Sequence, residues 1–136
     1  MTPVAVTPVF EWRAAFASAD VEALHAAGFG HPPTETDWWA RVRAHSVGWV
    51  CARRAGRLVG FVNVAWDGGE HAFLVDTVVA DDERGTGIGT GLVAAAATGA
   101  RQAGCAWLHV DFVPELAPFY LDSCGFRSTP AGLIAL

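Results

Sequence analysis

A glycine-rich segment in the middle of the chain constrains the fold more than any other feature. Arg84-Gly-Thr-Gly-Ile-Gly89 follows an apolar run over residues 73–80 and precedes a second one over 92–97. This order predicts a strand, a turn and a helix. Glycines let the backbone approach a ligand closely, and a helix start offers unpaired N–H groups and a positive dipole end. The segment therefore predicts a phosphate or pyrophosphate site, with a tight turn that holds no ligand as the alternative.

Hydrophobic periodicity and turn residues predict ten elements in the order β-α-α-β-β-β-α-β-α-β. The expected strands are Val4–Val6, Gly48–Arg54, Leu58–Trp66, His71–Ala80, Ala106–Phe112 and residues 126–136. The expected helices are Glu11–Ala27, Trp38–Ala44, Gly91–Ala103 and Glu115–Ser123. The three middle strands should be antiparallel, and strand 106–112 should run parallel to strand 71–80 through a right-handed crossover. These elements predict an α+β protein, an α/β sandwich.

Length and charge restrict the function. The chain has 136 residues, 52% of them hydrophobic, which predicts one domain over residues 1–136. Its net charge is −5 with no basic block, so we expect no nucleic-acid partner. The chain contains nine Arg and no Lys, which excludes Schiff-base and P-loop lysine chemistry.

The cysteines and histidines give no sign of a metal site. Cys51, Cys105 and Cys124 form no CxxC pair, and HxxxH and HExxH spacings are absent from the sequence. We therefore expect no metal, no disulfide scaffold and a cytoplasmic location. No apolar run approaches the ~18 residues of a membrane-spanning helix, so no membrane association is expected.

Two segments together resemble one protein family. Arg84–Gly89 resembles the Arg/Gln-x-x-Gly-x-Gly/Ala signature of the GNAT family of N-acetyltransferases, and Ala117–Phe126 resembles the later Ala-x-x-Phe-Tyr-x-x-x-Gly-Phe segment. One predicted helix and one strand separate them, as in the family. The strong similarity covers about residues 73–126. The resemblance implies a mixed, mostly antiparallel sheet with a splayed parallel pair, helices on both faces, and an acceptor side in the N-terminal half.

The resemblance also implies acetyl-CoA as the acyl donor. Carried onto this chain, the pyrophosphate would be held by backbone N–H groups of the signature loop, with Thr90 as a hydroxyl contact. The loop residues are Arg84, Gly85, Thr86, Gly87, Ile88 and Gly89. The pantetheine arm would pair with main-chain groups near Val78 and Val79 as an added strand, and the Val79 N–H would lie near the thioester carbonyl. Pro114 stands where the family often has Asn.

Acetyl transfer to an amine requires a neutral amine, an oxyanion donor and a proton for the leaving thiolate. The resemblance implies that Tyr120, the only tyrosine, is the general acid. Asp76 lies within an apolar strand, which is costly for a charge without a partner, and we expect it to be the base. His109 or Asp111, or water with no dedicated base, are the alternatives.

The acceptor is expected to bind against the N-terminal half, and the net negative charge favours a cation. Candidate wall residues are His31, Trp38, Trp39, Trp49 and Trp66, and candidate attracting acids are Glu35, Asp37, Asp67 and Glu70. The alternative is that most of these tryptophans are core and the acids are solvated. The apolar residues 133–136 are a candidate homodimer edge.

The expected function is transfer of an acetyl group from acetyl-CoA to a primary amine of a small molecule or peptide by direct attack. A non-catalytic CoA-binding regulatory module is the main alternative. A nucleotide-dependent oxidoreductase is more remote: Gly89–Ala94 matches G-x-G-x-x-A, with Asp111 about 20 residues on. However, these glycines would begin well after the strand ends.

Overall fold

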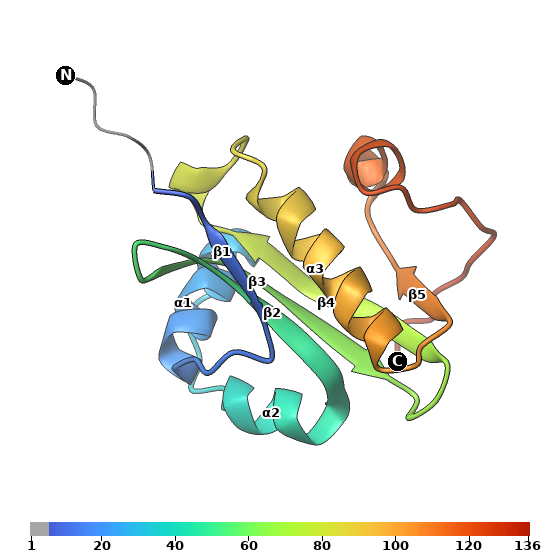
Figure 1. Ribbon diagram of the computed structural model, residues 1–136, viewed down its shortest axis with the longest axis horizontal. Coiled ribbons are helices and arrows are strands. Elements are labelled where there is room, and N and C mark those ends of the chain that lie inside the picture. The colour runs from blue at the N-terminus through green and yellow to red at the C-terminus, as the bar shows by residue number, and fades with distance from the viewer. Residues whose placement is uncertain (1–5) are drawn as a thin grey trace.

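The computed structural model describes residues 6–136, which form a five-stranded sheet in the order β1-β2-β3-β4-β5 (Figure 1). The strands are β1 Val9–Trp12, β2 Ser46–Arg54, β3 Arg57–Trp66, β4 His71–Val79 and β5 Trp107–Val110. The helices are α1 Ser18–Phe29, α2 Trp38–His45 and α3 Ile88–Gln102, with short helical turns η1 Asp81–Glu83, η2 Pro114–Leu116 and η3 Pro118–Ser123. Strands β1 to β4 pair antiparallel, and β4 pairs parallel with β5. The predicted α+β class and mixed sheet are confirmed.

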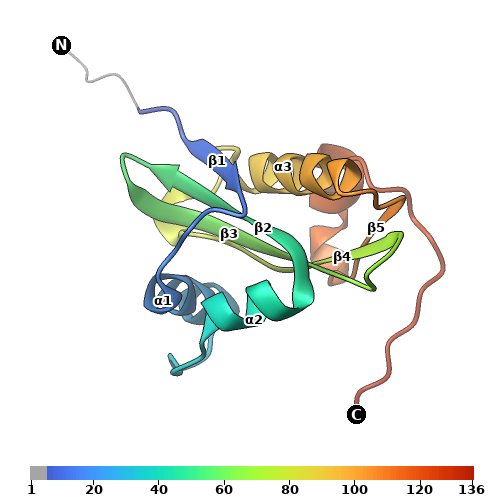
Figure 2. The same cartoon turned by 60° about the horizontal axis from the view of Figure 1, so that its bottom comes forward.

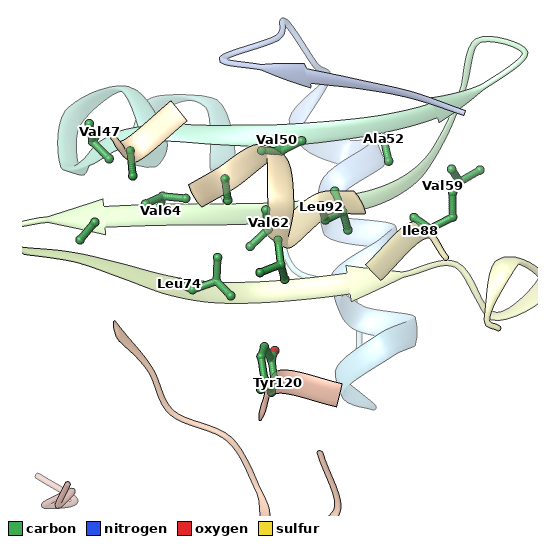
Figure 3. Packing of buried hydrophobic residues seen from close by; sticks show 14 of the residues in the cluster. Val47, Val50, Ala52, Val59, Val62, Val64, Leu74, Ile88, Leu92 and Tyr120 are labelled. Atoms are coloured by element: carbon green, nitrogen blue, oxygen red, sulfur yellow. The ribbon is translucent and has the colours of Figure 1, made fainter. Parts of the chain in front are cut away.

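The helices cover both faces of the sheet. Helix α3 lies on one face, and α1 and α2 lie on the other (Figure 2). The α3 face buries a cluster that includes Val62, Leu92 and Tyr120 (Figure 3). The opposite face buries a second cluster that includes Trp38 and Phe61. The alternation of side chains along β2 and β3 therefore supplies two apolar layers, as expected for a sheet that is covered on both sides.

Strands β4 and β5 separate after a short paired segment. Their register joins residues 71–74 to residues 107–110, after which β5 ends and β4 continues to Val79. A bulge lies at this point, since Asp76 has a φ of 59° and the register to β3 shifts between Phe61 and Asn63. The bulge reverses the faces of β4: Leu74 packs in the α3 cluster, whereas Val78 packs in the opposite one. The expected splayed pair is present.

The N-terminal elements differ from the prediction. Of the predicted strand Val4–Val6, only Val6 is among the described residues, and it is not in a strand. The first strand is β1, which takes the beginning of the predicted helix Glu11–Ala27. The indole of Trp12 packs closely against Gly48 and Gly99. This tertiary contact outweighs the helical periodicity of the segment, and α1 begins only at Ser18.

The C-terminal elements also differ. The predicted helix Glu115–Ser123 is divided into the 3-10 turn η2 and the π-helical η3. Pro118 explains the division, because it has no N–H to continue a helical ladder. Residues 126–136 were predicted as a strand, but they lie in irregular backbone (Figure 1). Pro130 and Gly132 interrupt this segment, and both residue types disfavour a strand interior.

The remaining boundaries agree with the prediction to within a few residues. Strand β2 begins at Ser46 rather than Gly48, and β5 is shorter than the predicted Ala106–Phe112. Within residues 6–136, no helix is long and apolar enough to cross a bilayer.

Candidate active site

The glycine-rich segment forms an open turn at the start of α3. Gly85 and Gly87 have φ values of 77° and 88°, and a Cβ at either position would meet nothing within 4 Å. Glycine is needed here for its left-handed backbone rather than for space. Helix α3 begins at Ile88, three residues before the predicted start, and the Gly91 N–H donates to Gly87 O at 3.1 Å. The N–H groups of Ile88, Gly89 and Thr90 precede that first helical bond and are free to bind an anion.

Arginines hold the acidic turn η1 that leads into this loop. Arg54 bonds Glu83 at 3.1 Å, Arg57 bonds Asp82 at 2.8 Å, and Arg84 bonds Asp81 at 3.2 Å. Arg57 donates to Asp82 and lowers the pKa of that carboxyl below its ordinary value. The three carboxylates next to the anion site are thus each neutralised by a guanidinium.

The Thr86 hydroxyl is occupied within the same turn. Its Oγ1 donates to the Glu83 carbonyl oxygen at 2.6 Å. Thr86 therefore fixes the loop conformation through its side chain and leaves its backbone N–H for a ligand.

The backbone of Val79 faces the gap between β4 and β5. The Ala80 N–H donates to Val59 O at 2.8 Å, so Ala80 points to β3. Successive residues of a strand point their main-chain groups to opposite sides. Hence Val79 turns its N–H and C=O away from β3, toward the side where β5 has ended, and Val78 turns its own toward Phe61 of β3. A main-chain contact in the gap, predicted for both valines, is available at Val79 and not at Val78.

Tyr120 lies on the α3 side of the sheet. The residue is only 6% exposed, and its ring stacks on Phe112, with ring centroids 5.1 Å apart. Phe119 and Phe126 pack against it edge-on at 4.8 and 5.9 Å. Figure 3 shows its oxygen directed toward β4. Three rings thus fix a phenol that points to the strand bordering the gap.

Asp76 lies on the opposite side of β4. Its Oδ1 is 3.1 Å from His25 Nε2 of α1, and its Oδ2 accepts from Asn63 Nδ2 of β3 at 3.3 Å. Helix α1 approaches β4 closely because it presents Gly28 to Val78, where a Cβ would lie 2.3 Å from Val78 Cγ2. Tyr120 and Asp76 therefore do not meet. They border β4 from its two faces.

The alternative bases lie elsewhere. His109 Nε2 is 2.8 Å from His71 Nδ1, and its ring stacks on Phe73 at 4.8 Å. Asp111 follows the end of β5 and is exposed. It borders a cavity of about 1000 Å³ between α3, β5 and the C-terminal segment, which Thr90 also lines. The two alternative bases therefore do not lie on one strand, because β5 ends at Val110 before Asp111.

The predicted acceptor wall is only partly at the surface. Trp38 and Trp49 are each 2% exposed and belong to the core, whereas Trp66 is 37% exposed at the end of β3. Trp39 is partly buried against Phe16, with ring centroids 5.2 Å apart. The alternative interpretation as core residues is thus right for Trp38 and Trp49.

The predicted attracting acids divide in the same way. Asp37 caps α2 by accepting from Ala40 N at 3.0 Å. Asp67 accepts from Gly69 N at 2.7 Å, which lowers the pKa of its carboxyl. Glu35 and Glu70 are exposed. Two of the four acids therefore stabilise local backbone.

Three polar residues of this region were not predicted from the sequence. His25, Asn63 and Glu22 surround Asp76 and the segment after α1. Glu22 is 4% exposed and accepts from Trp38 Nε1 and from Thr34 N, each at 2.9 Å; the bond from Trp38 is the main reason that its pKa is lowered. A usable signal existed for Asn63, the polar residue within the apolar run 58–66.

Two other predicted classes can be compared with the geometry. Among residues 6–136, no group of three or more His, Cys, Asp or Glu side chains is placed to hold a metal. The oxidoreductase alternative required a turn at Gly89–Ala94, but these residues lie inside α3. There Gly91 packs against the Phe10 ring, and a Cβ at Gly89 would lie 3.1 Å from the Phe119 ring. Both glycines therefore serve packing of a helix.

Solved structures of other proteins share this fold. A GNAT-family protein from Streptococcus pneumoniae superposes with a TM-score of 0.76 at 20% identity, covering 96% of this chain and 98% of that one. A Trypanosoma brucei acetyltransferase gives 0.74 at 23% identity, covering 93% and 99%. A GNAT-family N-acetyltransferase from Escherichia coli in complex with CoA gives 0.69 at 16% identity, covering 93% and 72%.

Among curated protein sequences, none matches this chain. The sequence model described as the acetyltransferase (GNAT) family matches residues 9–126, which include β1 to β5, the glycine turn and the Tyr120 segment. This chain belongs to the GNAT acetyltransferase family.

Proposed function

We propose that this protein transfers the acetyl group of acetyl-CoA to a primary amine of a small molecule or peptide. One observation carries the proposal: the gap where β4 and β5 separate has a free Val79 main chain on its edge and leads along η1 to the open glycine turn at α3. A thioester in the gap and a pyrophosphate at the turn would use one continuous surface.

The residues present fit CoA. The turn offers backbone N–H groups of residues 85–90 with open space beside Gly85 and Gly87. Val79 offers one N–H and one C=O for an added strand. When bound, acetyl-CoA supplies an activated acetyl group on sulfur. The glycine turn thus suits the anionic pyrophosphate, and the Val79 main chain suits the amide-containing pantetheine arm.

The chain's own residues supply the acid and base chemistry. Asp76 accepts a proton from the amine on the α1 side of β4. The Val79 N–H stabilises negative charge on the carbonyl oxygen. Tyr120 donates its phenolic proton to the thiolate from the α3 side. The separate placement of Asp76 and Tyr120 suits a direct transfer, because the amine nitrogen and the departing sulfur occupy different corners of the tetrahedral intermediate and each needs its own proton-transfer group.

The acceptor side is proposed to lie over α1, α2 and the residues 30–37 between them. This side carries the exposed Glu35 and the partly exposed His31. The net charge of −5 favours a cationic amine.

The first experiment is calorimetric titration of the full chain with acetyl-CoA, CoA and NAD. We expect micromolar binding of both CoA species and none of NAD. A thiol-release assay over alkyl, aromatic and peptide amines follows. Failure of acetyl-CoA to bind would overturn the proposed function. Binding without thiol release from any amine would contradict catalysis and support the non-catalytic CoA-binding module.

We also propose that the protein forms a homodimer and that it is located in a reducing cytoplasm. Leu133 and Ile134 are exposed by 84% and 82%, and β5 is an edge of the described sheet. Cys51, Cys105 and Cys124 are free thiols, and burial raises the pKa of Cys51 to about 11. Sedimentation of the wild type beside a Leu133→Ser/Ile134→Ser double variant tests the dimer; equal monomer fractions would refute this edge.

A further inference from the structure

A continuous chain of polar contacts runs from Asp76 toward solvent. His25 places Nε2 at 3.1 Å from Asp76 Oδ1 and Nδ1 at 2.7 Å from His31 Nε2. His31 then places Nδ1 at 2.8 Å from Pro32 O. On the other side, Asn63 donates to Asp76 Oδ2, and Ser46 Oγ donates to Asn63 Oδ1 at 2.5 Å. The exposed fractions of the side chains are 25% for Asp76, 17% for His25 and 34% for His31.

The donors and acceptors in this row of contacts determine how many protons its side chains hold. The Pro32 carbonyl only accepts, so His31 Nδ1 carries a proton. Each of the other two contacts needs one proton between its atoms. When all three contacts are hydrogen bonds, His25, His31 and Asp76 together hold three protons on their nitrogens and oxygens. Two neutral imidazoles and a carboxylate hold only two. The fully hydrogen-bonded group of His25, His31 and Asp76 thus carries one proton more than its neutral imidazoles and carboxylate. Loss of that proton breaks one of the three contacts.

The surroundings orient both rings. His25 lies between Phe29 and Trp38, with centroids 4.4 and 4.9 Å away. Glu22 Oε2 lies 4.0 Å from His31 Nδ1. The Arg41 guanidinium lies over the Trp38 ring at 4.7 Å. The charged groups next to the two imidazoles are thus Asp76 at His25 and Glu22 at His31, and the Glu22 carboxylate stabilises a positive charge on His31.

We propose that His25 and His31 form a proton relay that carries the amine's proton from Asp76 to solvent. The proposal rests on the proposed function. In the reaction, the amine nitrogen forms a bond to the acetyl carbon and the carbon–sulfur bond breaks. An alkylammonium starts with three N–H protons: one remains on the amide, one ends on the CoA thiol, and one is released. Asp76 receives that released proton, His25 passes it on, and His31 delivers it to water. His25 and His31 are positioning and relay residues.

The test compares two amines in the His25→Gln and His31→Gln proteins. An alkylamine is protonated at neutral pH and needs the relay, whereas an aromatic amine is already neutral and does not. We expect each variant to lower kcat/KM by about 10²-fold for the alkylamine, with little change for the aromatic amine. The loss should shrink as the pH rises toward the range where the alkylamine is neutral. His45→Gln, at an exposed histidine of α2, is the matched control and should match the wild type.

Equal losses with both amines, or a loss that persists at high pH, would show that the histidines only support the structure and would overturn the relay. A second measurement is independent of turnover. Nitrogen-15 spectra of labelled histidines should show His31 protonated at Nδ1, and proton loss from the wild type should change the His25 and His31 signals together. Independent titration of the two rings would refute the relay. If acetyl-CoA fails to bind, the proposed function falls, while these spectra still decide whether the chain holds the shared proton.

Discussion

Asp76 is the residue on which the candidate site depends most. Its left-handed backbone creates the bulge that turns β4 over, and its carboxylate joins α1 to β3. A positive φ is uncommon outside glycine and tolerated best by Asp and Asn. An ordinary strand residue would keep the alternation of Leu74 and would direct this side chain to the α3 side. The residue type, the bulge and the polar contacts are therefore one feature.

Tyr120 is tested by removal of its hydroxyl alone. The Tyr120→Phe protein keeps the ring that stacks on Phe112, so we expect unchanged folding and CoA binding. Loss of a general acid should lower kcat by about 10²-fold. Steady-state kinetics measure kcat, and calorimetry measures the binding of CoA. An unchanged kcat would exclude this role.

Glu22 should make the free energy of unfolding depend on pH in the acid range. Its pKa is lowered in the folded protein, mainly because Trp38 donates to it, so its stabilising effect is complete above the pKa of the unfolded chain, about 4.3. That effect is lost as the pH falls through the lower folded pKa. Urea unfolding of the Glu22→Gln protein should thus show a smaller decline in acid than the wild type. Glu35→Gln, at an exposed acid, is the control. Parallel curves for wild type and Glu22→Gln would contradict this account.

At the scale of the elements, the contact between β1 and α3 explains why the predicted helix Glu11–Ala27 does not begin at Glu11. A helix over residues 11–27 would satisfy local periodicity, but Phe10 and Trp12 bury their rings against Gly91 and Gly99 of α3 when the segment is a strand. The rings fill the space that the helix glycines leave.

Gly99→Ala separates the two influences on α3. Helix propensity alone predicts a gain of about 1 kcal/mol. The new Cβ would lie 2.3 Å from the Trp12 ring, which Gly48 confines from the other side, and overpacking of a core costs about 1–3 kcal/mol. We expect net destabilisation in denaturant unfolding. Gly132→Ala, with nothing within 4 Å, is the control. A stabilised Gly99→Ala protein would show that the contact is loose.

The turn before α3 is tested through Gly87. A left-handed backbone costs a residue with a Cβ about 1–2 kcal/mol, so the Gly87→Ala protein should bind CoA several-fold more weakly as its turn relaxes. The same calorimetric titration measures the change. Affinity equal to that of the wild type would mean that these N–H groups do not hold the pyrophosphate.

At the scale of the whole molecule, net charge sets the encounter with the acceptor. The chain carries −5, and interactions between exposed charges are screened over about 10 Å at 0.1 M salt. We expect kcat/KM for a cationic amine to fall as salt is added, and kcat/KM for a neutral aromatic amine to stay constant. Steady-state kinetics with each amine over a series of salt concentrations measure both values of kcat/KM. Equal salt dependence for both amines would exclude steering.

The sequence by itself determined the features that are local. The apolar runs of β2, β3 and β4, the glycine turn and the α3 run are all specified by neighbouring residues, because a short apolar run between turn residues and a positive φ are short-range properties. The paired motifs at Arg84–Gly89 and Ala117–Phe126 were sufficient for the family.

The tertiary structure alone decided which residues meet. His25, His31, Asn63 and Asp76 come from α1, the segment after it, β3 and β4, and no spacing in the sequence relates them. The same holds for β1, whose strand form depends on glycines of a distant helix, and for the end of β5, which opens the gap beside Val79. Contacts between distant segments depend on how whole layers pack, and only the packed layers specify them.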